Sequence, residues 1–369
     1  MARPLDVAIF IRAFEGGGAQ RDAILLANAL SRLGVGVAIV TLQPEGPFAQ
    51  LVAPEVEVVT LRPRKLRYAL PALRGVLLKR RPRAVLSSEA APNVLTYLAA
   101  RSLPRATRPH ILLREVASPS AARDGDPSLQ GRLAYRFVGR VYRAASRVLV
   151  LAAGARDDLI QNFGVPAQQI HVMRSNAVID PATEARLSKA AFDHPRERGL
   201  IVWVGRLSPE KDPLLAVEAL SLLPASSGAH LRFIGEGAMK DAILARAAEL
   251  GVADRVSVAG HVSDPFQSLL AAELAVCTSR FEGFGNAIVE ALACGTPVVA
   301  TDCPWGPREI LEGGRYGTMV PVGDAPGLAA AIVRALKSPP DRAALRERAS
   351  RYRTGTAARE FIDVLDELD

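Results

Sequence analysis

Residues 279–302, SRFEGFGNAIVEALACGTPVVATD, determine how we interpret the rest of the chain. An apolar run at 274–278 has the composition of a buried strand and leads into a loop that carries Glu282 and two glycines. Residues 286–294 have the spacing of a helix packed on one side, and Gly295 ends this helix before another apolar strand begins. A glycine loop that opens a helix presents unpaired backbone N–H groups and the positive end of the helix dipole, so an anion such as a diphosphate can bind there.

Two carboxylates flank this predicted anion site. Glu282 lies in the loop and Glu290 one turn into the helix, so both can point into one cleft and accept hydrogen bonds from sugar hydroxyls. On their own they can equally be solvated surface acids. The complete string, with seven residues between the glutamates, resembles the signature of the family 4 glycosyltransferases, which are retaining enzymes of the GT-B fold. The resemblance implies an α/β protein of two Rossmann-like, doubly wound parallel-sheet domains that face each other across a cleft.

The composition is that of a globular protein with room for two domains. The chain has 369 residues, of which 49% are hydrophobic and 23% charged. Its three cysteines, Cys277, Cys294 and Cys303, include no CxxC pair, which argues for a reducing compartment and against a disulfide framework or a structural zinc site. No stretch approaches the ~20 apolar residues of a membrane span, and charged residues interrupt the first apolar segment. We therefore expect a cytoplasmic protein.

The net charge of +8 is divided unevenly along the chain. Residues 1–190 carry 27 Lys and Arg against 14 Asp and Glu, a net +13, whereas residues 191–369 carry 19 against 24, a net −5. A basic first half suggests an anionic partner, which can be nucleic acid, anionic lipid or a phosphorylated acceptor.

The first half alternates apolar strands with amphipathic helices, which predicts a doubly wound parallel sheet. We expect strands at 7–11, 35–42, 56–61, 84–88, 111–114, 147–151 and 170–173, and helices at 19–33, 68–79, 92–103, 131–144 and 155–162. The glycines 16–18 do not follow G-x-G-x-x-G, so a dinucleotide site is not predicted. They can form a tight turn. They also resemble the first loop of family 4 enzymes, which lies across the cleft from the donor diphosphate.

The polar segment 115–130 is expected to be a loop for acceptor recognition or mobility. Its Asp124-Gly125-Asp126 mimics a metal-binding DxD motif, but D-G-D in such a segment is ordinary turn chemistry.

Two segments carry the positive charge of the first half. Residues 62–83 hold nine basic side chains among leucines, and residues 132–147 place Arg136, Arg140 and Arg143 among Tyr135, Phe137 and Tyr142. Both segments suit an interfacial helix on an anionic membrane. Alternatively, both are amphipathic helices that cover a sheet and keep their arginines in water.

A domain boundary is expected between 180 and 198, where two prolines and a polar run break the alternation. We predict an acceptor-binding domain at 1–190, a nucleotide-sugar-binding domain at 191–354 and a final helix at 355–369. In the GT-B fold, this last helix crosses back to the first domain.

The loop GRLSPEKDP, residues 205–213, follows the first strand of the second domain. It places Arg206 and Lys211 within about one turn before Pro213 opens a helix. Two cations at the carboxyl edge of a sheet suit a diphosphate, because arginine binds it bidentately and lysine acts as a point charge. The loop resembles the donor-phosphate loop of the family.

The resemblance also assigns individual residues. It implies catalytic roles for Arg206, Lys211 and Glu282, with Glu282 holding the donor sugar and Glu290 the ribose hydroxyls. It implies donor contacts from Gly17, Gly18, Gly205, Gly235, His261, Val262, Phe284, Gly285, Asn286, Ala287 and Glu290, and no metal ligand or cofactor. Many family members carry a histidine after the strand corresponding to 111–114, whereas this chain has Glu115-Val116-Ala117.

The expected activity is therefore retaining, metal-independent transfer of a sugar from a nucleotide diphosphate sugar. UDP-hexose or UDP-N-acetylhexosamine is the expected donor. The loop 302–310 resembles members that act on lipid-linked glycans, so we expect a polyprenyl-diphosphate-linked or surface glycan acceptor at the inner face of the membrane. A nucleotide-sugar epimerase of the same fold is the alternative. A nucleic-acid-binding protein is disfavoured, because aromatics are only 5% and no RNA-binding signature is present.

Overall fold

The structure is a computed structural model that describes residues 5–15, 17–117, 119–125, 129–190, 194–262 and 264–368. The chain forms two compact units, one comprising Met1–Asp180 with Tyr352–Asp369 and the other Pro181–Arg351. The sequence placed these boundaries at 190 and 354. They differ because helix α7, Pro181–Ala190, belongs to the second unit, where Arg186 pairs with Asp264 and the carbonyl of Leu187 accepts a hydrogen bond from Arg346.

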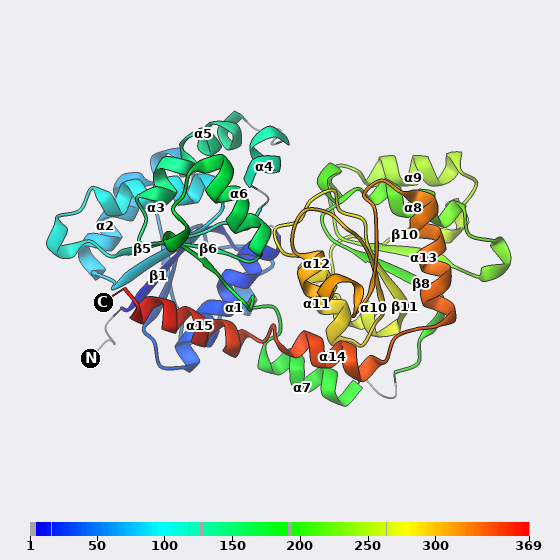
Figure 1. Cartoon of the computed structure of the whole chain (residues 1–369). Helices are drawn as coiled ribbons and strands as arrows, with labels where there is room; N and C mark the ends of the chain where they lie inside the picture. The colour runs from blue at the N-terminus through cyan, green and yellow to red at the C-terminus, as the bar shows by residue number, and fades with distance from the viewer. Residues whose placement is uncertain are drawn as a thin grey trace. The chain divides into compact units, whose positions relative to one another are not determined.

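The first unit is built on a seven-stranded sheet with the order β3-β2-β1-β4-β5-β6-β7, in which every pair is parallel (Figure 1). Its inner strands are nearly continuous apolar runs, because helices cover both faces of a parallel sheet. They are β1 Val7–Ala13, β2 Val37–Gln43, β3 Glu57–Thr60, β4 Ala84–Ser88, β5 His110–Arg114, β6 Arg147–Val150 and β7 Ile170–Val172. The helices are α1 Gly18–Arg32, α2 Leu70–Arg80, α3 Ala90–Arg101, α4 Pro119–Gly125, α5 Leu129–Arg143 and α6 Ala153–Phe163.

The second unit has a six-stranded parallel sheet with the order β10-β9-β8-β11-β12-β13. The strands are β8 Glu197–Val204, β9 His230–Ile234, β10 Val256–Val258, β11 Ala272–Cys277, β12 Val298–Thr301 and β13 Thr318–Val320. Besides α7, the helices are α8 Pro213–Ser221, α9 Lys240–Glu249, α10 Phe266–Ala271, α11 Asn286–Ala293, α12 Pro307–Ile310, α13 Ala325–Lys337 and α14 Arg342–Ser350. Trp203 and Phe233 pack together in its core. Both sheets confirm the predicted doubly wound architecture.

The C-terminal helix α15, Thr354–Asp366, completes the first unit. It packs beside α1 (Figure 1), and Phe361 is fully buried. Its Glu360 accepts hydrogen bonds from the backbone N–H groups of Arg174 and Ser175 at 2.8 and 3.1 Å. These bonds tie the end of the chain to the segment that follows β7.

The predicted loop at 115–130 is wrong in part, because residues 119–125 form helix α4. Ser120 explains its start, since its backbone N–H donates to Asp158 of α6 at 2.9 Å. Asp126 of the D-G-D string, Ser118 and Gly16 of the first glycine loop lie outside the described residues.

Among the described residues, no helix combines the length and the hydropathy that crossing a membrane requires.

Candidate active site

Strand order in the second sheet brings the predicted donor residues to one place. Strands β8 and β11 are neighbours at the centre, and the chain continues from them towards opposite sides of the sheet. This is a topological switch point, and ligands of open α/β sheets bind outside the carboxyl ends of the strands there. Arg206 and Lys211 follow β8, whereas Glu282 follows β11. The structure therefore places the two cations and the first glutamate at the same edge.

Glycines allow three loops at this edge to pack backbone to backbone. The N–H of Gly205 donates to Ile234 at 3.0 Å, and the N–H of Gly235 donates to Gly260 at 2.8 Å. A Cβ on Gly235 would lie 1.8 Å from the carbonyl oxygen of Gly205. The predicted sites Gly205 and Gly235 thus hold the loops after β8, β9 and β10 together.

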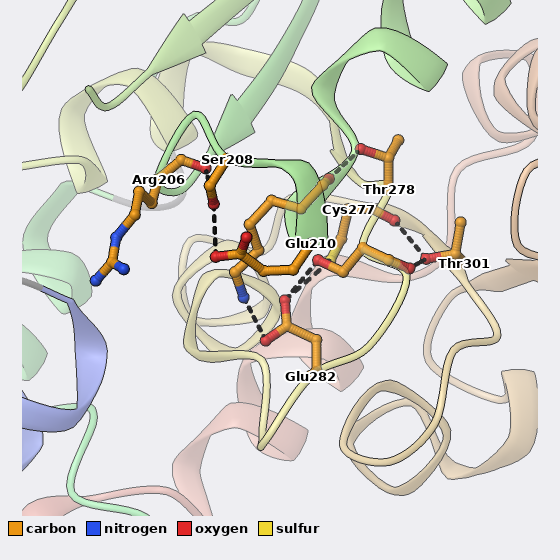
Figure 2. A network of polar contacts seen from close by, with 9 residues as sticks. Arg206, Ser208, Glu210, Cys277, Thr278, Glu282 and Thr301 are labelled. Atoms are coloured by element: carbon orange, nitrogen blue, oxygen red, sulfur yellow. Dashed lines mark hydrogen bonds and ion pairs between the residues drawn. The ribbon is translucent and has the colours of Figure 1, made fainter. Parts of the chain in front are cut away.

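The centre of the candidate site is an ion pair between Lys211 and Glu282 (Figure 2). Lys211 Nζ lies 2.6 Å from Glu282 Oε2, and the lysine and glutamate side chains are only 26% and 9% exposed. Ser279 Oγ donates to the other carboxylate oxygen at 2.7 Å. Glu282 is therefore held by partners on both carboxylate oxygens and is not a solvated surface acid. The sequence alone had left both possibilities open.

Burial lowers the pKa of Lys211, but the negative charge of Glu282 and the hydrogen bond to it outweigh burial, so the pKa is raised overall. Lys211 is accordingly a permanent cation at neutral pH. Its ammonium group has three N–H donors. The bond to Glu282 therefore does not exhaust its capacity to bind phosphate oxygens.

A second set of hydrogen bonds fixes the backbone of Lys211. Thr278 Oγ1 donates to the carbonyl of Lys211 at 3.0 Å and accepts from Trp203 Nε1 at 2.9 Å. Thr301 Oγ1 in turn donates to the carbonyl of Ser279 at 2.6 Å. Figure 2 shows Thr278 and Thr301 to the upper right of Glu282.

Sequence reasoning did not identify Trp203, Thr278, Ser279 or Thr301. Their positions in and directly after the central strands of the second sheet were the available signal, because side chains at the carboxyl ends of these strands meet.

Arg206 differs from Lys211 in being unengaged. Its side chain is exposed, and Figure 2 shows it directed away from Glu282. Among the described residues, no hydrogen bond or ion pair to its guanidinium is found. An exposed cation together with a paired one suits a diphosphate that arrives from solvent.

The loop after β11 turns sharply into helix α11 at Gly285, whose φ of +110° favours glycine. Asn286 and Ala287 begin the helix, so their N–H groups point out of its N-terminal end. Phe284 is buried, and its carbonyl packs so closely on Gly306 that a Cβ there would lie 1.8 Å from the oxygen. The segment 302–307 thus packs against the backbone of the loop that forms the predicted anion site.

The remaining residues that were predicted to contact the donor lie on different elements. Glu290 is 6% exposed on α11, one turn beyond the helix start. His261 and Val262 follow β10 at the edge of the sheet, exposed and half-buried respectively. Gly17 and Gly18 begin α1 in the first unit.

No group of three or more His, Cys, Asp or Glu side chains with the spacing of a metal site occurs in the part of the chain that the structure describes.

Two protein-family models match successive parts of the chain. Residues 16–175 match Glycosyltransferase Family 4, and residues 185–352 match Glycosyl transferases group 1. The matched ranges correspond closely to the two units of the structure.

Curated relatives are glycosyltransferases. One is the N-acetylgalactosamine-N,N'-diacetylbacillosaminyl-diphospho-undecaprenol 4-alpha-N-acetylgalactosaminyltransferase of Campylobacter jejuni. It is 28% identical over 233 residues, which cover 63% of this chain and 60% of that protein. Another is the lipopolysaccharide core biosynthesis glycosyltransferase LpsE of Rhizobium meliloti, 35% identical over 176 residues, with 48% and 51% covered. The aligned region thus spans about half to three fifths of the length of these relatives.

Solved structures share the fold over the full length. HepE from Anabaena, in complex with UDP and glucose, superposes with a TM-score of 0.77 at 20% identity, covering 98% of this chain and 99% of that one. Sucrose-phosphate synthase from Thermosynechococcus elongatus gives 0.78 at 20% identity, with 99% of both chains covered. Two Rossmann-like units, both family models and these relatives agree with the predicted resemblance, and the chain belongs to the family 4 glycosyltransferases, with the GT-B fold.

Proposed function

We propose that this protein is a retaining glycosyltransferase that moves a hexose or N-acetylhexosamine from a UDP-sugar to a hydroxyl of a lipid-linked glycan. The observation that carries the proposal is the pairing of Lys211 with Glu282 beside the unengaged Arg206 at the switch point of the second sheet. Relatives support the substrate classes, since HepE structures contain UDP or UDP-glucose and the Campylobacter enzyme is named for a diphospho-undecaprenol substrate.

In the proposed reaction, Arg206 and Lys211 stabilise the charge that develops on the leaving diphosphate, which is where fixed cations lower a barrier most. The N–H groups at the start of α11 donate to the same diphosphate. Glu282, fixed by Lys211 and Ser279, accepts hydrogen bonds from hydroxyls of the donor sugar. Glu290 accepts from the ribose hydroxyls.

The bond changes require no protein nucleophile. The bond between the anomeric carbon and the β-phosphate oxygen breaks, and the acceptor oxygen bonds to that carbon on the same face. The acceptor proton passes to the departing phosphate oxygen, so the products are the retained glycoside and UDP. Glu282 is unsuited to act as the nucleophile, because both of its oxygens are already engaged.

A screen of donors and acceptors tests the proposal. The protein is incubated with UDP-glucose, UDP-galactose and their N-acetylamino counterparts, each with undecyl diphosphate carrying one of the same four sugars. At least one combination should release UDP together with an elongated lipid-linked product. Donor-only reactions serve as controls, and an epimerised UDP-sugar in them would favour the epimerase alternative. Failure of all sixteen combinations would contradict these substrate classes.

We further propose that the first unit docks on an anionic membrane. Helix α3 packs between α2 and α5. Each of these three elements, counting the turn before α2, exposes one large apolar side chain: Tyr68, Leu98 and Phe137 are 56%, 47% and 50% exposed. Exposed basic residues accompany them, namely Arg62, Arg64, Lys65, Arg67, Lys79, Arg81, Arg101, Arg136 and Arg140. We call this set the α2–α3–α5 face.

Two leucines of the first basic segment do not contribute to this docking. Leu73 and Leu77, on the inner side of α2, are fully buried, and Arg80 is paired with Glu57. Attachment therefore relies on surface charge and the few exposed apolar side chains. Each basic residue near an anionic bilayer contributes about 1 kcal/mol, so the exposed set is sufficient for reversible binding.

Vesicle flotation tests this docking. Wild type should float with phosphatidylglycerol-containing vesicles and detach as salt shortens the Debye length. A variant with Arg67, Lys79, Arg81, Arg136 and Arg140 replaced by Gln should remain in solution. A control variant with Lys240, Arg334 and Lys337 of the second unit replaced by Gln should float normally. Equal flotation of both variants would contradict the proposed face.

A further inference from the structure

Three consecutive residues of the loop after β8 are hydrogen-bonded to the segment that ends β11 and follows it. The carbonyl of Glu210 accepts a hydrogen bond from the backbone N–H of Arg280 at 2.8 Å, and the carbonyl of Lys211 accepts one from Thr278 Oγ1 at 3.0 Å. Asp212 completes the series through its side chain, since its Oδ2 accepts from Arg280 Nε at 2.9 Å. These contacts hold the two segments together on both sides of Lys211.

The ion pair of the candidate site joins the same two segments. Lys211 Nζ lies 2.6 Å from Glu282 Oε2, and Glu282 follows Arg280 by two residues. A group that acts on a transition state must be placed accurately, because a misplacement of about 1 Å can reduce the rate by about 100-fold. The position of the Lys211 ammonium group therefore depends on how these segments are held.

Asp212 differs from an ordinary helix cap in what its carboxylate contacts. It is the N-cap of α8, where an aspartate usually accepts a hydrogen bond from a backbone N–H of the first turn. Among the described residues no such bond is found, and the carboxylate pairs with Arg280 instead. The φ and ψ of Asp212, 43° and 57°, are left-handed, a conformation that glycine adopts without strain and that aspartate and asparagine tolerate. A glycine here would therefore keep the turn and remove only the contact.

The pair between Asp212 and Arg280 contributes little to stability. The aspartate side chain is 10% exposed, but the arginine side chain is 61% exposed, and water weakens ion pairs with so exposed a partner. The hydrogen bond remains directional, because both of its groups are charged and its length is 2.9 Å. Removing the pair should therefore loosen the loop 205–213 and leave the second unit folded.

We propose that Asp212 and Arg280 are positioning residues that hold the Lys211 ammonium group beside Glu282 for its action on the leaving diphosphate. This inference rests on the proposed function, in which Lys211 stabilises the developing charge, and it adds the pair that fixes this cation. Neither residue needs to touch the donor, because both act through the backbone of the loop 205–213.

Steady-state kinetics with the best donor and acceptor from the screen described above tests the pair from both sides. Asp212→Gly removes the carboxylate, and Arg280→Gln removes the guanidinium. Each should lower kcat by about 10-fold, with a donor KM within about threefold of wild type. Asp212→Asn retains an acceptor oxygen and tolerates the left-handed conformation, so it should lose only about threefold in kcat.

Melting temperature separates positioning from folding. That of Asp212→Gly should stay within about 3 °C of wild type, because the lost pair is exposed on one side. Glu218→Gln, which breaks the pair with Arg246 elsewhere in the second unit, is the matched control and should keep the wild-type kcat. A kcat within about twofold of wild type in Asp212→Gly would overturn the inference. So would a fall in melting temperature of several degrees with an unchanged kcat.

A variant of Lys211 shows whether the pair acts through this residue. In a Lys211→Met background, Asp212→Gly should lower kcat no further, because the cation that Asp212 positions is absent. A second loss of about 10-fold in that background would show that Asp212 acts by another route, and the inference would fail.

Urea unfolding tests the positioning without any sugar transfer. A double-mutant cycle of Lys211→Met and Glu282→Gln measures the coupling between the two side chains, and this coupling should fall by about half or more when Asp212→Gly is also present. Unchanged coupling would overturn the inference, whether or not transfer is observed. Absence of transfer by the wild type, together with reduced coupling, would refute the proposed function and still support the positioning role.

Discussion

Replacing Lys211 and Glu282 together should cost less stability than the two single replacements predict. The two charged atoms lie 2.6 Å apart. At this distance Coulomb's law gives an attraction of about 1.6 kcal/mol with the dielectric constant of water and about 6 kcal/mol at an effective value of 20. Desolvation offsets much of the larger figure, and the partial exposure of Lys211 reduces it further. We therefore expect a net coupling of about 1.5–3 kcal/mol.

Lys211→Met should lower the free energy of unfolding by about 2–3 kcal/mol, because it leaves a buried carboxylate that accepts from Ser279 and, at 3.9 Å, from the weak thiol donor of Cys277. Glu282→Gln should lower it by about 1–2 kcal/mol. The double variant should be more stable than the sum of these losses by at least about 1 kcal/mol. Since the raised pKa of Lys211 lies above its ordinary value of 10.5, its stabilising contribution is complete below that pH and is lost only as pH rises further. The coupling should therefore be constant across neutral pH.

Urea unfolding followed by tryptophan fluorescence reports on the second structural unit, which contains the ion pair. Both tryptophans, Trp203 and Trp305, belong to this unit, Pro181–Arg351. The more exposed pair of Arg246 and Glu218 provides the control cycle and should show little coupling. Additive losses at Lys211 and Glu282, within about 0.5 kcal/mol, would refute the reasoning.

Two further predictions concern Glu115 and the glycine contacts. Burial raises the pKa of Glu115 from 4.5 to about 7, although hydrogen bonds from Tyr142 and the backbone oppose the shift. The unfolded chain therefore releases this proton at lower pH than the folded protein, and the free energy of unfolding should fall as pH rises from about 4.5 to 7. In wild type this fall in the free energy of unfolding should reach up to about 3 kcal/mol, and Glu115→Gln should abolish it. Urea unfolding followed by circular dichroism measures both proteins, and the same pH dependence in the variant as in wild type would contradict the prediction. Gly235→Ala, whose Cβ would overlap the carbonyl of Gly205, should destabilise by about 3 kcal/mol or more and weaken UDP binding in calorimetry. Gly228→Ala, with a φ of +67° and open space, should cost only about 1–2 kcal/mol and leave UDP binding intact, and equal effects of the two would argue against the contact.

Sequence periodicity predicted the strands of the first sheet well, because parallel strands are apolar runs separated by glycine, proline and polar residues, but it missed β13 of the second sheet, which has only three residues. Strand β4, Ala84–Ser88, was placed without error. Helix α4 was missed because its proline, serine and glycine are typical of loops, and Asp158, distant in sequence, stabilises its start. The sequence analysis assigned helix α7 to the linker between the domains. Its partners Asp264 and Arg346 are also distant in sequence, so local residue patterns do not reveal them.

The residues of the candidate site were predictable as types but not as partners. The segments containing Arg206, Lys211 and Glu282 could be found from their glycine and charge patterns. The ion pair could not, because it depends on β8 and β11 being neighbours, and strand order is a property of the whole sheet.

The anomeric configuration of the product tests the central claim most directly. The best donor from the screen, an α-linked UDP-sugar, is incubated with its undecyl-diphosphate acceptor, and the new linkage is assigned by proton NMR of the purified product. Front-face transfer at the Lys211–Glu282 edge predicts an α-linkage in the wild type. Lys211→Met should give the same linkage at a kcat lower by about 100-fold. A β-linked product, or a Lys211 variant with unchanged kcat, would contradict the account.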